Sequence, residues 1–160
     1  MKVIDILNKS DKAVFSFELV PPLKGGDINK IYEAIEPLIA LAPPFINITF
    51  HRDEVVYREY PDGTIKKVTV TKRPGSVALA AAIMRRYNVD MVPHIVCGGA
   101  TRHKIENELI DLNFLDIENV MALRGDPIPG ERFFTPEEDG HQYSCELVEQ
   151  ITRMNHGQYL

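Results

Sequence analysis

Four short apolar segments of this sequence each end in a side chain that can transfer a proton or bind a polar ligand. Carboxylates and imidazoles are frequent acids and bases in enzymes, and hydroxyl and guanidinium groups bind polar parts of a ligand. One such side chain is common, because polar residues at strand ends also cap helices and satisfy loop amides. Four segments that all end in this way indicate a shared site if the fold brings their ends together. The side chains are Glu18, Thr49, His51, His94, Arg124 and Asp126.

Glu18 lies inside the apolar run FSFELVPP and is a candidate general acid. Burial of a carboxylate without a partner is costly and raises its pKa, because the charged form loses its hydration. A carboxylic acid that stays neutral near pH 7 can donate a proton to a substrate. The alternative is a structural glutamate that a Lys or Arg holds in place.

His94 and the Arg124-Gly125-Asp126 tripeptide are less specific signals. His94 is followed by two β-branched residues, so a core histidine and a site residue fit its surroundings equally well. Gly125 would let the backbone approach a ligand, with opposite charges on either side. The tripeptide also occurs by chance on ordinary loops, and an adhesion function is disfavoured because secretory features are lacking.

A metal site is a further hypothesis for these side chains. His51, His94, Glu18 and Asp126 are conceivable ligands, but they come from different predicted strands and lack a diagnostic local spacing. We therefore expect no bound metal.

The elements that must position these groups alternate between short β-branched runs and longer helical patterns, which is typical of parallel βαβ units. The predicted strands span residues 13–20, 45–50, 91–96 and 119–123. The predicted helices begin after the cap Asp27, at the cap Ser76, at about residue 101 and at about residue 144. Residues 55–71 contain two alternating runs around Pro61-Asp62-Gly63, which predicts a β-hairpin insertion after the second strand.

Two α/β architectures fit this order, an open doubly wound sheet and a closed (β/α)8 barrel, and the pattern alone does not separate them. In both, functional groups lie at the carboxyl ends of the strands. A standard Rossmann or P-loop nucleotide site is disfavoured, because the first strand ends in PPLKGG and not in a glycine-rich phosphate loop.

Composition narrows the class of protein further. The 160 residues carry 18 basic and 23 acidic side chains, a formal net charge of -5, which suits one soluble domain and disfavours a nucleic-acid partner. Residues 66–73 are the only basic cluster. Cys97 and Cys145 cannot build a disulfide framework and are expected to be reduced thiols. Early charges disfavour a secretory signal and no apolar run could span a bilayer, so we predict a cytoplasmic protein without a membrane partner.

The strand ends, taken in order, resemble the amino-terminal half of bacterial methylenetetrahydrofolate reductase. The matching segments are FSFELVPP, INITF, PHIVC and ENVMALRGDP, and the later YSCELV is similar to the start of that family's next helix. The resemblance implies a (β/α)8 TIM barrel that binds FAD. It also implies that NADH or NADPH delivers a hydride to the flavin, which then reduces the folate substrate 5,10-methylenetetrahydrofolate to 5-methyltetrahydrofolate in one-carbon and methionine metabolism.

The resemblance also implies roles for individual residues. Glu18 matches the family's SFEFFPP pattern and would be the acid that opens the imidazolidine ring by protonating the N10 side of the folate. Asp126, in the LRGD pattern, would orient the folate and stabilise the resulting 5-iminium cation, and its charge would disfavour reduced anionic flavin. Phe50 stands where the family has a tyrosine. With Asp126, the implied flavin-binding positions are Thr49, Phe50, His94, Arg124, Gly125 and Ser144.

Four βα units account for about half of an eight-unit barrel. We therefore expect residues 1–160 to form a single domain, a partial barrel truncated after the fourth unit, that is inactive alone and pairs as a homo-oligomer. A non-catalytic assembly or binding module that uses its open strand edges is the alternative, and bound flavin colour would distinguish the two. A metal-dependent barrel enzyme is a third and weaker hypothesis. The sequence assigns no role to His51 or Arg52 and does not choose between NADH and NADPH.

Overall fold

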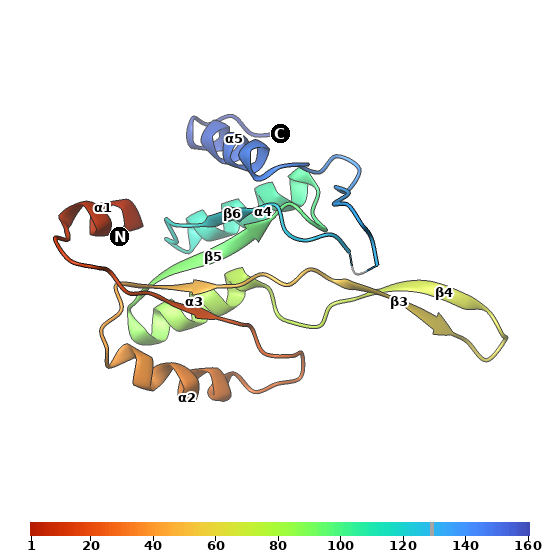
Figure 1. Cartoon of the computed structure of the whole chain (residues 1–160), viewed down its shortest axis with the longest axis horizontal. Coiled ribbons are helices and arrows are strands. Elements are labelled where there is room, and N and C mark those ends of the chain that lie inside the picture. The colour runs from red at the N-terminus through yellow and green to blue at the C-terminus, as the bar shows by residue number, and fades with distance from the viewer. Residues whose placement is uncertain (129) are drawn as a thin grey trace.

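A four-stranded parallel β-sheet forms the centre of the computed structural model, which describes residues 1–128 and 130–160 (Figure 1). The strands lie in the order β1 (Phe17–Leu19), β2 (Phe45–Ile48), β5 (Asp90–Val96) and β6 (Met121–Leu123). Glu18 pairs with Asn47, Asn47 with Val92, and His94 with Met121. All these pairings are parallel, so the carboxyl ends of the strands meet at one edge of the sheet and the predicted α/β class is confirmed.

Helices follow the strands along the chain and bury one face of the sheet. They are α2 (Ile28–Ile39), α3 (Ser76–Tyr87), α4 (Arg102–Phe114) and α5 (Ser144–Asn155), with a short helix, α1 (Val3–Lys9), before the first strand. Alternate side chains of β2 and β5 pack against these helices. The resulting core includes Ile46, Ile48, Ile83, Met91 and Ile95, each at most 1% exposed. Within residues 1–128 and 130–160, no helix has the apolar length that a bilayer requires.

The helix starts show how local hydrogen bonds set the boundaries. Asp27 caps α2 as predicted, because its carboxylate accepts a hydrogen bond from the Asn29 amide at 2.9 Å. The prediction that Ser76 caps α3 is wrong, since Gly75 occupies that position. Ser76 is buried in the first turn, where its hydroxyl donates to the His94 carbonyl at 3.2 Å. The hydroxyl therefore joins α3 to the site-bearing strand β5.

The predicted hairpin is confirmed as β3 (Glu54–Glu59) and β4 (Ile65–Val70), an antiparallel pair that projects from the sheet (Figure 1). The turn closes with a hydrogen bond from the Tyr60 amide to the Thr64 carbonyl at 2.9 Å. Asp62 accepts from the Thr64 amide at 3.0 Å, and Gly63 adopts a φ of +78° that side chains disfavour. The sequence Pro-Asp-Gly thus sets the turn.

Three strands of the sheet are shorter than predicted, β5 begins one residue earlier than predicted, and one helix was not predicted. Residues 13–16 are outside β1, because this edge strand has a partner only in the short β2, and Phe15 remains 76% exposed. Residues 49–50 and 119–120 likewise lie beyond the paired segments of β2 and β6. The unpredicted helix is α1, which has no buried residue. A helix that packs against no core does not need the periodic apolar positions from which helices are predicted.

The packing of α3 predicts a large stability effect for Ile83→Ala. Ile83 is fully buried, so the variant should lose about 2–5 kcal/mol of unfolding free energy through the cavity it creates. Ile65→Ala is the matched control, because Ile65 is 68% exposed on the hairpin and should cost less than about 0.5 kcal/mol. Urea denaturation measures both values, and equal losses in the two variants would contradict the assigned core.

Candidate functional site at the carboxyl ends of the strands

The carboxyl ends of the parallel strands and the base of the hairpin enclose a cavity of about 780 Å³. Its walls come from segments that are far apart in the sequence, which is how parallel βα units assemble a site. Among the residues predicted from the sequence, the cavity is lined by Glu18, Thr49, Phe50, His94, Gly125 and Asp126.

Glu18 and His94 lie on the face of the sheet that points away from the core. The Glu18 carboxylate approaches His94 Nε2 to 3.7 Å, just outside ordinary hydrogen-bond distance. The expectation that Glu18 is buried is wrong, because its side chain is 57% exposed. β1 is an edge strand, and Glu18 opens into the cavity instead of a packed interior. The apolar neighbours of Glu18 in the sequence therefore do not remove its carboxyl group from water.

His94 is the buried member of this pair, with only 5% of its surface exposed. Burial lowers the pKa of His94 below its usual 6.5, and the nearby Glu18 carboxylate acts in the opposite direction. The imidazole is therefore neutral at pH 7. Among the described residues, its buried Nε2 atom has no hydrogen-bond partner. Such an atom at a cavity wall can accept from or donate to a ligand.

Thr49 and His51 follow β2 and form the adjoining wall. The Thr49 hydroxyl donates to the Leu19 carbonyl at 3.3 Å and lies 3.3 Å from His51 Nε2. Burial and the charge of Arg73 lower the pKa of His51, so this imidazole is also predominantly neutral at pH 7. Thr49 and His51 therefore make this part of the wall polar without adding a charge. The adjacent Arg52 and Asp53 carry the charged side chains.

Gly125 brings the backbone after β6 to the edge of the cavity. Its φ is +86°, and an added Cβ would lie 2.5 Å from Val96 Cγ1. A side chain at this position would be strained at this φ, and Val96 or the loop would have to move to make room for it. The close approach of Val96 on the neighbouring strand therefore favours glycine here, and so would a ligand that approaches the backbone.

Arg124 and Ser144 lie in a neighbouring hollow of about 500 Å³ that shares Gly125 and Asp126 with the main cavity. The Arg124 guanidinium stands over the Phe134 ring at 5.5 Å, and Arg124 lines this hollow and not the main cavity. Ser144 begins α5, and its position is set by Glu146, whose carboxylate accepts from the Gln142 amide at 2.7 Å. The predicted residues therefore share one rim but divide between two connected hollows.

Arg52 joins three loops around the cavity, a role that sequence reasoning missed. Its guanidinium lies against Gly98 and Gly99, where a Cβ on Gly99 would come within 3.3 Å of Arg52 Nε. Its Nη2 atom reaches the Glu137 carboxylate at 3.3 Å. The only sequence signal was its position two residues after the predicted second strand, 45–50.

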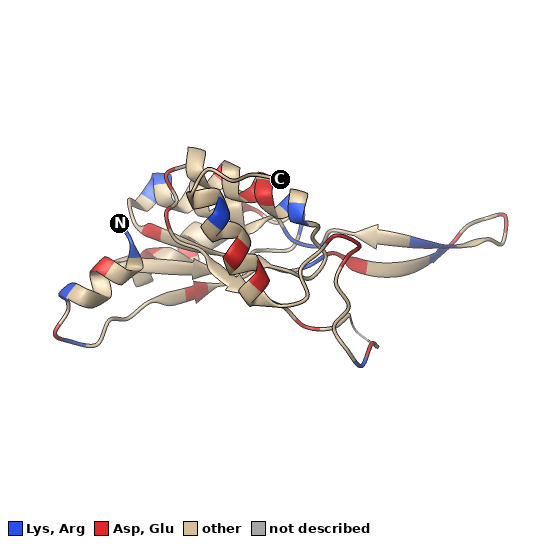
Figure 2. Ribbon diagram, turned by 90° about the horizontal axis from the view of Figure 1, so that it is seen from above, with Lys and Arg blue, Asp and Glu red and all other residues tan. Residues whose placement is uncertain are grey.

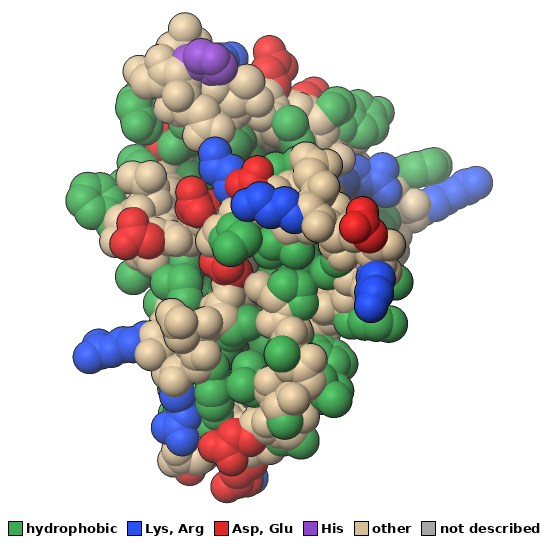
Figure 3. All heavy atoms as spheres, turned by 90° about the vertical axis from the view of Figure 1, so that its left-hand side faces the viewer, with side chains coloured by type: hydrophobic (Ala, Val, Ile, Leu, Met, Phe, Trp, Pro, Cys, Tyr) green, Lys and Arg blue, Asp and Glu red, His purple; other side chains and the backbone are tan. Residues whose placement is uncertain are grey.

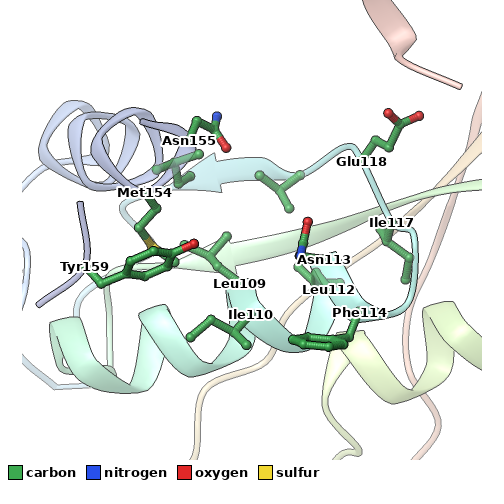
Figure 4. A pocket seen from close by; sticks show the side chains of 12 residues that line it. Leu109, Ile110, Leu112, Asn113, Phe114, Ile117, Glu118, Met154, Asn155 and Tyr159 are labelled. Carbon is green, nitrogen blue, oxygen red and sulfur yellow. The ribbon is translucent and has the colours of Figure 1, made fainter. Parts of the chain in front are cut away.

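A second cavity, of about 540 Å³, lies between α4, α5 and the amino-terminal side of β6 (Figure 4). Its lining combines apolar side chains with Asn113, Asn155 and Glu118, which is its single carboxylate. It therefore lacks the neighbouring acid and imidazole of the larger cavity. In the described part of the chain, no group of three His, Cys, Asp or Glu side chains is arranged to hold a metal ion.

Parallel βα units with an acid, an imidazole and a hydroxyl at the carboxyl ends of the strands place this protein in the class of α/β proteins that build ligand sites on strand ends. A model of the methylenetetrahydrofolate reductase family matches residues 2–160. The chain belongs to that family.

Individual relatives agree with this assignment. The chain is 27% identical over 162 residues to "Methylenetetrahydrofolate reductase (NADH) 1" of Arabidopsis thaliana, covering 99% of this chain and 24% of the relative. It is 25% identical to "Probable methylenetetrahydrofolate reductase (NADPH)" of Caenorhabditis elegans, covering 98% and 21%. It is 26% identical to "5,10-methylenetetrahydrofolate reductase" of Salmonella typhimurium, covering 83% and 38%. The chain thus spans less than half the length of each of these relatives.

The geometry of His94 predicts how its proton affinity responds to Glu18. In an NMR titration, the pKa of His94 should lie below 6.5, and Glu18→Gln should lower it further by removing the neighbouring charge. The unfolded chain protonates this histidine near pH 6.5, whereas folded His94 binds a proton only at lower pH. The free energy of unfolding should therefore decrease as the pH falls below 6.5, and His94 should not change it above that pH. Glu33→Gln, on the exposed surface of α2, is the control. A His94 pKa that rises in Glu18→Gln would contradict the arrangement.

Proposed function

We propose that this chain forms part of a flavin-dependent reductase that converts 5,10-methylenetetrahydrofolate to 5-methyltetrahydrofolate with NADH or NADPH. Membership of the family supports the reaction, and the names of the plant and nematode relatives support either nicotinamide donor. The observation that carries the proposal is the Glu18 carboxylate 3.7 Å from the buried His94 imidazole in one cavity.

The residues around the cavity fit a flavin. Its volume, about 780 Å³, lies within the range of about 300–1,000 Å³ typical of small-molecule sites. His94 offers a buried polar atom without a partner, and Gly125 keeps the backbone close. Bound FAD would accept a hydride from the nicotinamide and pass it to the folate. The residues we propose to hold it are Thr49, Phe50, His94, Arg124, Gly125, Asp126 and Ser144.

Glu18 is proposed as the acid that acts on the folate. Its carboxyl proton goes to N10 as the bond between N10 and the bridging methylene carbon breaks, and the electron pair of that bond stays on N10. The 5-iminium cation that forms can accept a hydride. A neutral His94 does not hold the Glu18 carboxylate as an ion pair, and Glu18 opens into the cavity where the folate would lie.

Asp126 supplies a negative charge at the boundary of the two hollows. There it would stabilise the developing cation on the folate and orient the pterin ring. Since Asp126 lies on the same rim as Glu18, one carboxyl group serves as the proton donor and the other as a fixed charge.

The four βα units would form the amino-terminal half of a (β/α)8 barrel, with residues 1–160 as a single domain. Support comes from the edges of β1 and β6, each of which has one neighbouring strand within residues 1–128 and 130–160 and can pair with a further strand. The same edges support homo-oligomerisation. The free thiols Cys97 and Cys145 support a reducing, cytoplasmic location.

Glu18→Gln separates the two half-reactions of the proposed enzyme. Folate reduction should fall by about 10²–10⁴-fold, because the variant has no proton to donate, while reduction of the flavin by NADH or NADPH persists. Stopped-flow absorbance of the flavin follows each half-reaction, with the exposed Glu33→Gln as the control. Equal losses in both half-reactions would exclude the acid role.

Asp126→Asn tests the fixed charge independently. Loss of a negative charge beside the flavin should raise its reduction potential by on the order of 30 mV and weaken folate reduction. Spectroelectrochemical titration measures the potential, and Asp116→Asn, an exposed change in the turn after α4, is the control. An unchanged potential in Asp126→Asn would remove the electrostatic role.

A further inference from the structure

The segment of chain that follows the proposed acid is attached to the base of the hairpin. β1 has three residues and, among the described residues, one neighbouring strand, so few hydrogen bonds of the sheet hold Glu18. The Leu19 carbonyl accepts from the Thr49 amide at 3.0 Å and from the Thr49 hydroxyl at 3.3 Å. Pro21-Pro22 has no backbone N–H and cannot continue the pairing. The position of Glu18 therefore depends on what holds residues 21–24.

Two hydrogen bonds with the residues just after β4 hold this segment. The Arg73 guanidinium donates to the Pro21 carbonyl, and the Lys24 amide donates to the Lys72 carbonyl at 2.7 Å. Pro21 is less than 2% exposed, and a carbonyl on such a residue needs a donor within the protein. Among the residues that the structure describes, Arg73 is the one Arg or Lys whose side chain donates to residues 19–26. Lys72 and Arg73 therefore join the carboxyl end of β1 to the hairpin.

The hairpin returns the chain to the place where it leaves the sheet. Glu54, the first residue of β3, pairs with Val70, the last residue of β4. Just beyond this pair, the Lys72 ammonium group lies 2.5 Å from the Glu54 carboxylate. Burial and the charge of Arg73 both lower the pKa of His51, which precedes β3, so Arg73 also lies near the start of the hairpin. Figure 2 shows basic residues along the hairpin and where it joins the sheet. The register of the hairpin therefore determines where Lys72 and Arg73 lie.

An arginine suits the contact with Pro21. Its guanidinium group is always charged and presents several N–H donors in one plane, so its hydrogen bond to a carbonyl is charge-assisted. Arg73 is partly exposed and does not line the main cavity. Any effect of Arg73 on a ligand in that cavity must therefore pass through the segment that it holds, which lies three residues after Glu18.

The position of the Glu18 carboxylate depends on the backbone of β1. Its side chain is 57% exposed, so packing does not hold the carboxylate 3.7 Å from His94 Nε2. The pairing of Glu18 with Asn47 directs the side chain toward the cavity. Ends of strands with few contacts open locally, and release of Pro21 would allow this at the end of β1. Glu18 would then move away from His94.

We propose that Arg73 is a positioning residue for the proposed acid. By donating to the Pro21 carbonyl, it keeps the carboxyl end of β1 in place and the Glu18 carboxylate beside His94. The inference rests on the proposed function, since it assumes that Glu18 protonates the folate, and it assigns no proton transfer to Arg73. It also gives the hairpin a role, which is to bring Lys72 and Arg73 to the segment after β1.

Arg73→Met in the flavin-loaded enzyme that contains this chain tests the role, because methionine fills similar space and has no donor. The rate of folate reduction should fall by about tenfold or more, since a misplaced acid slows the step that it catalyses. The rate of flavin reduction by NADH or NADPH should stay at its wild-type value, and stopped-flow absorbance of the flavin follows both. Arg73→Lys keeps a charged donor and should retain most of the rate of folate reduction.

The pKa of His94 reports the position of Glu18 independently of catalysis. Burial lowers this pKa and the Glu18 carboxylate opposes the effect, so Arg73→Met should lower it, as Glu18→Gln does. Loss of a cation alone would raise the pKa, which separates displacement of Glu18 from a change in charge. In Arg73→Met/Glu18→Gln, the pKa should fall no further than in Glu18→Gln alone. An NMR titration measures these values, and the pKa of His51 should rise in Arg73→Met because a cation that lowers it is removed.

Two controls remove a cation elsewhere. Arg58→Met changes an exposed residue further along β3, and Lys9→Met changes one on α1, at the end of the molecule opposite the hairpin (Figure 1). That end has acidic and basic side chains interspersed among apolar ones (Figure 3). Both controls should leave the two half-reactions and the pKa of His94 at their wild-type values.

Three results would overturn the inference. These are equal losses in the two half-reactions of Arg73→Met, a pKa of His94 that stays or rises in that variant, and a loss in Arg73→Lys as large as in Arg73→Met. Arg73→Gln, with a shorter and uncharged side chain, carries the same expectations and takes the place of Arg73→Met if circular dichroism shows the latter to be unfolded. If Glu18→Gln separates the half-reactions and these variants do not, the proposed function stands and only this inference fails. If Glu18→Gln does not separate them, both fail.

Discussion

The parallel register of β2 and β5 is the constraint on which the rest of the structure depends. Strand side chains alternate between faces, so the register that buries Ile48 and Ile95 under the helices also places His94 on the other face. A shift of one residue would bury the imidazole in the core and expose the isoleucines. The same register therefore determines both the packing of the core and the position of His94. Helix α3 stabilises this position through the hydrogen bond from the Ser76 hydroxyl to the His94 carbonyl.

The edge of the sheet where the site lies has features that do not favour stability. His94 keeps a buried nitrogen without a partner among the described residues, and Gly125 occupies a conformation that strains other residues and has Val96 Cγ1 where a Cβ would lie. Local choices that cost stability cluster where a ligand would compensate for them. Their concentration around one cavity is a stronger functional signal than any one of them alone.

The sequence predicts the order of elements well because that order depends on local signals. The Asp27 cap, the Pro-Asp-Gly turn and the alternation of strands and helices all act within a few residues. The common rim of the predicted site residues follows from the parallel topology. The errors concern properties that depend on distant neighbours. Glu18 is exposed because its strand lies at an edge, and Ser76 bonds to β5 instead of capping its helix. Arg52 joins loops that meet only in the folded chain.

The central claim is that the ends of the strands form a flavin site, and an FAD titration of the enzyme that contains this chain, as wild type and as Gly125→Ala, tests it most directly. The added methyl would meet Val96 Cγ1 and would be strained at this φ, so Val96 or the loop that carries Asp126 must shift at the cavity wall. Wild type should quench flavin fluorescence with saturable, one-to-one binding, and the variant should bind at least tenfold more weakly while keeping its far-UV circular dichroism. Absence of binding by wild type, or equal binding by the two proteins, would contradict the account.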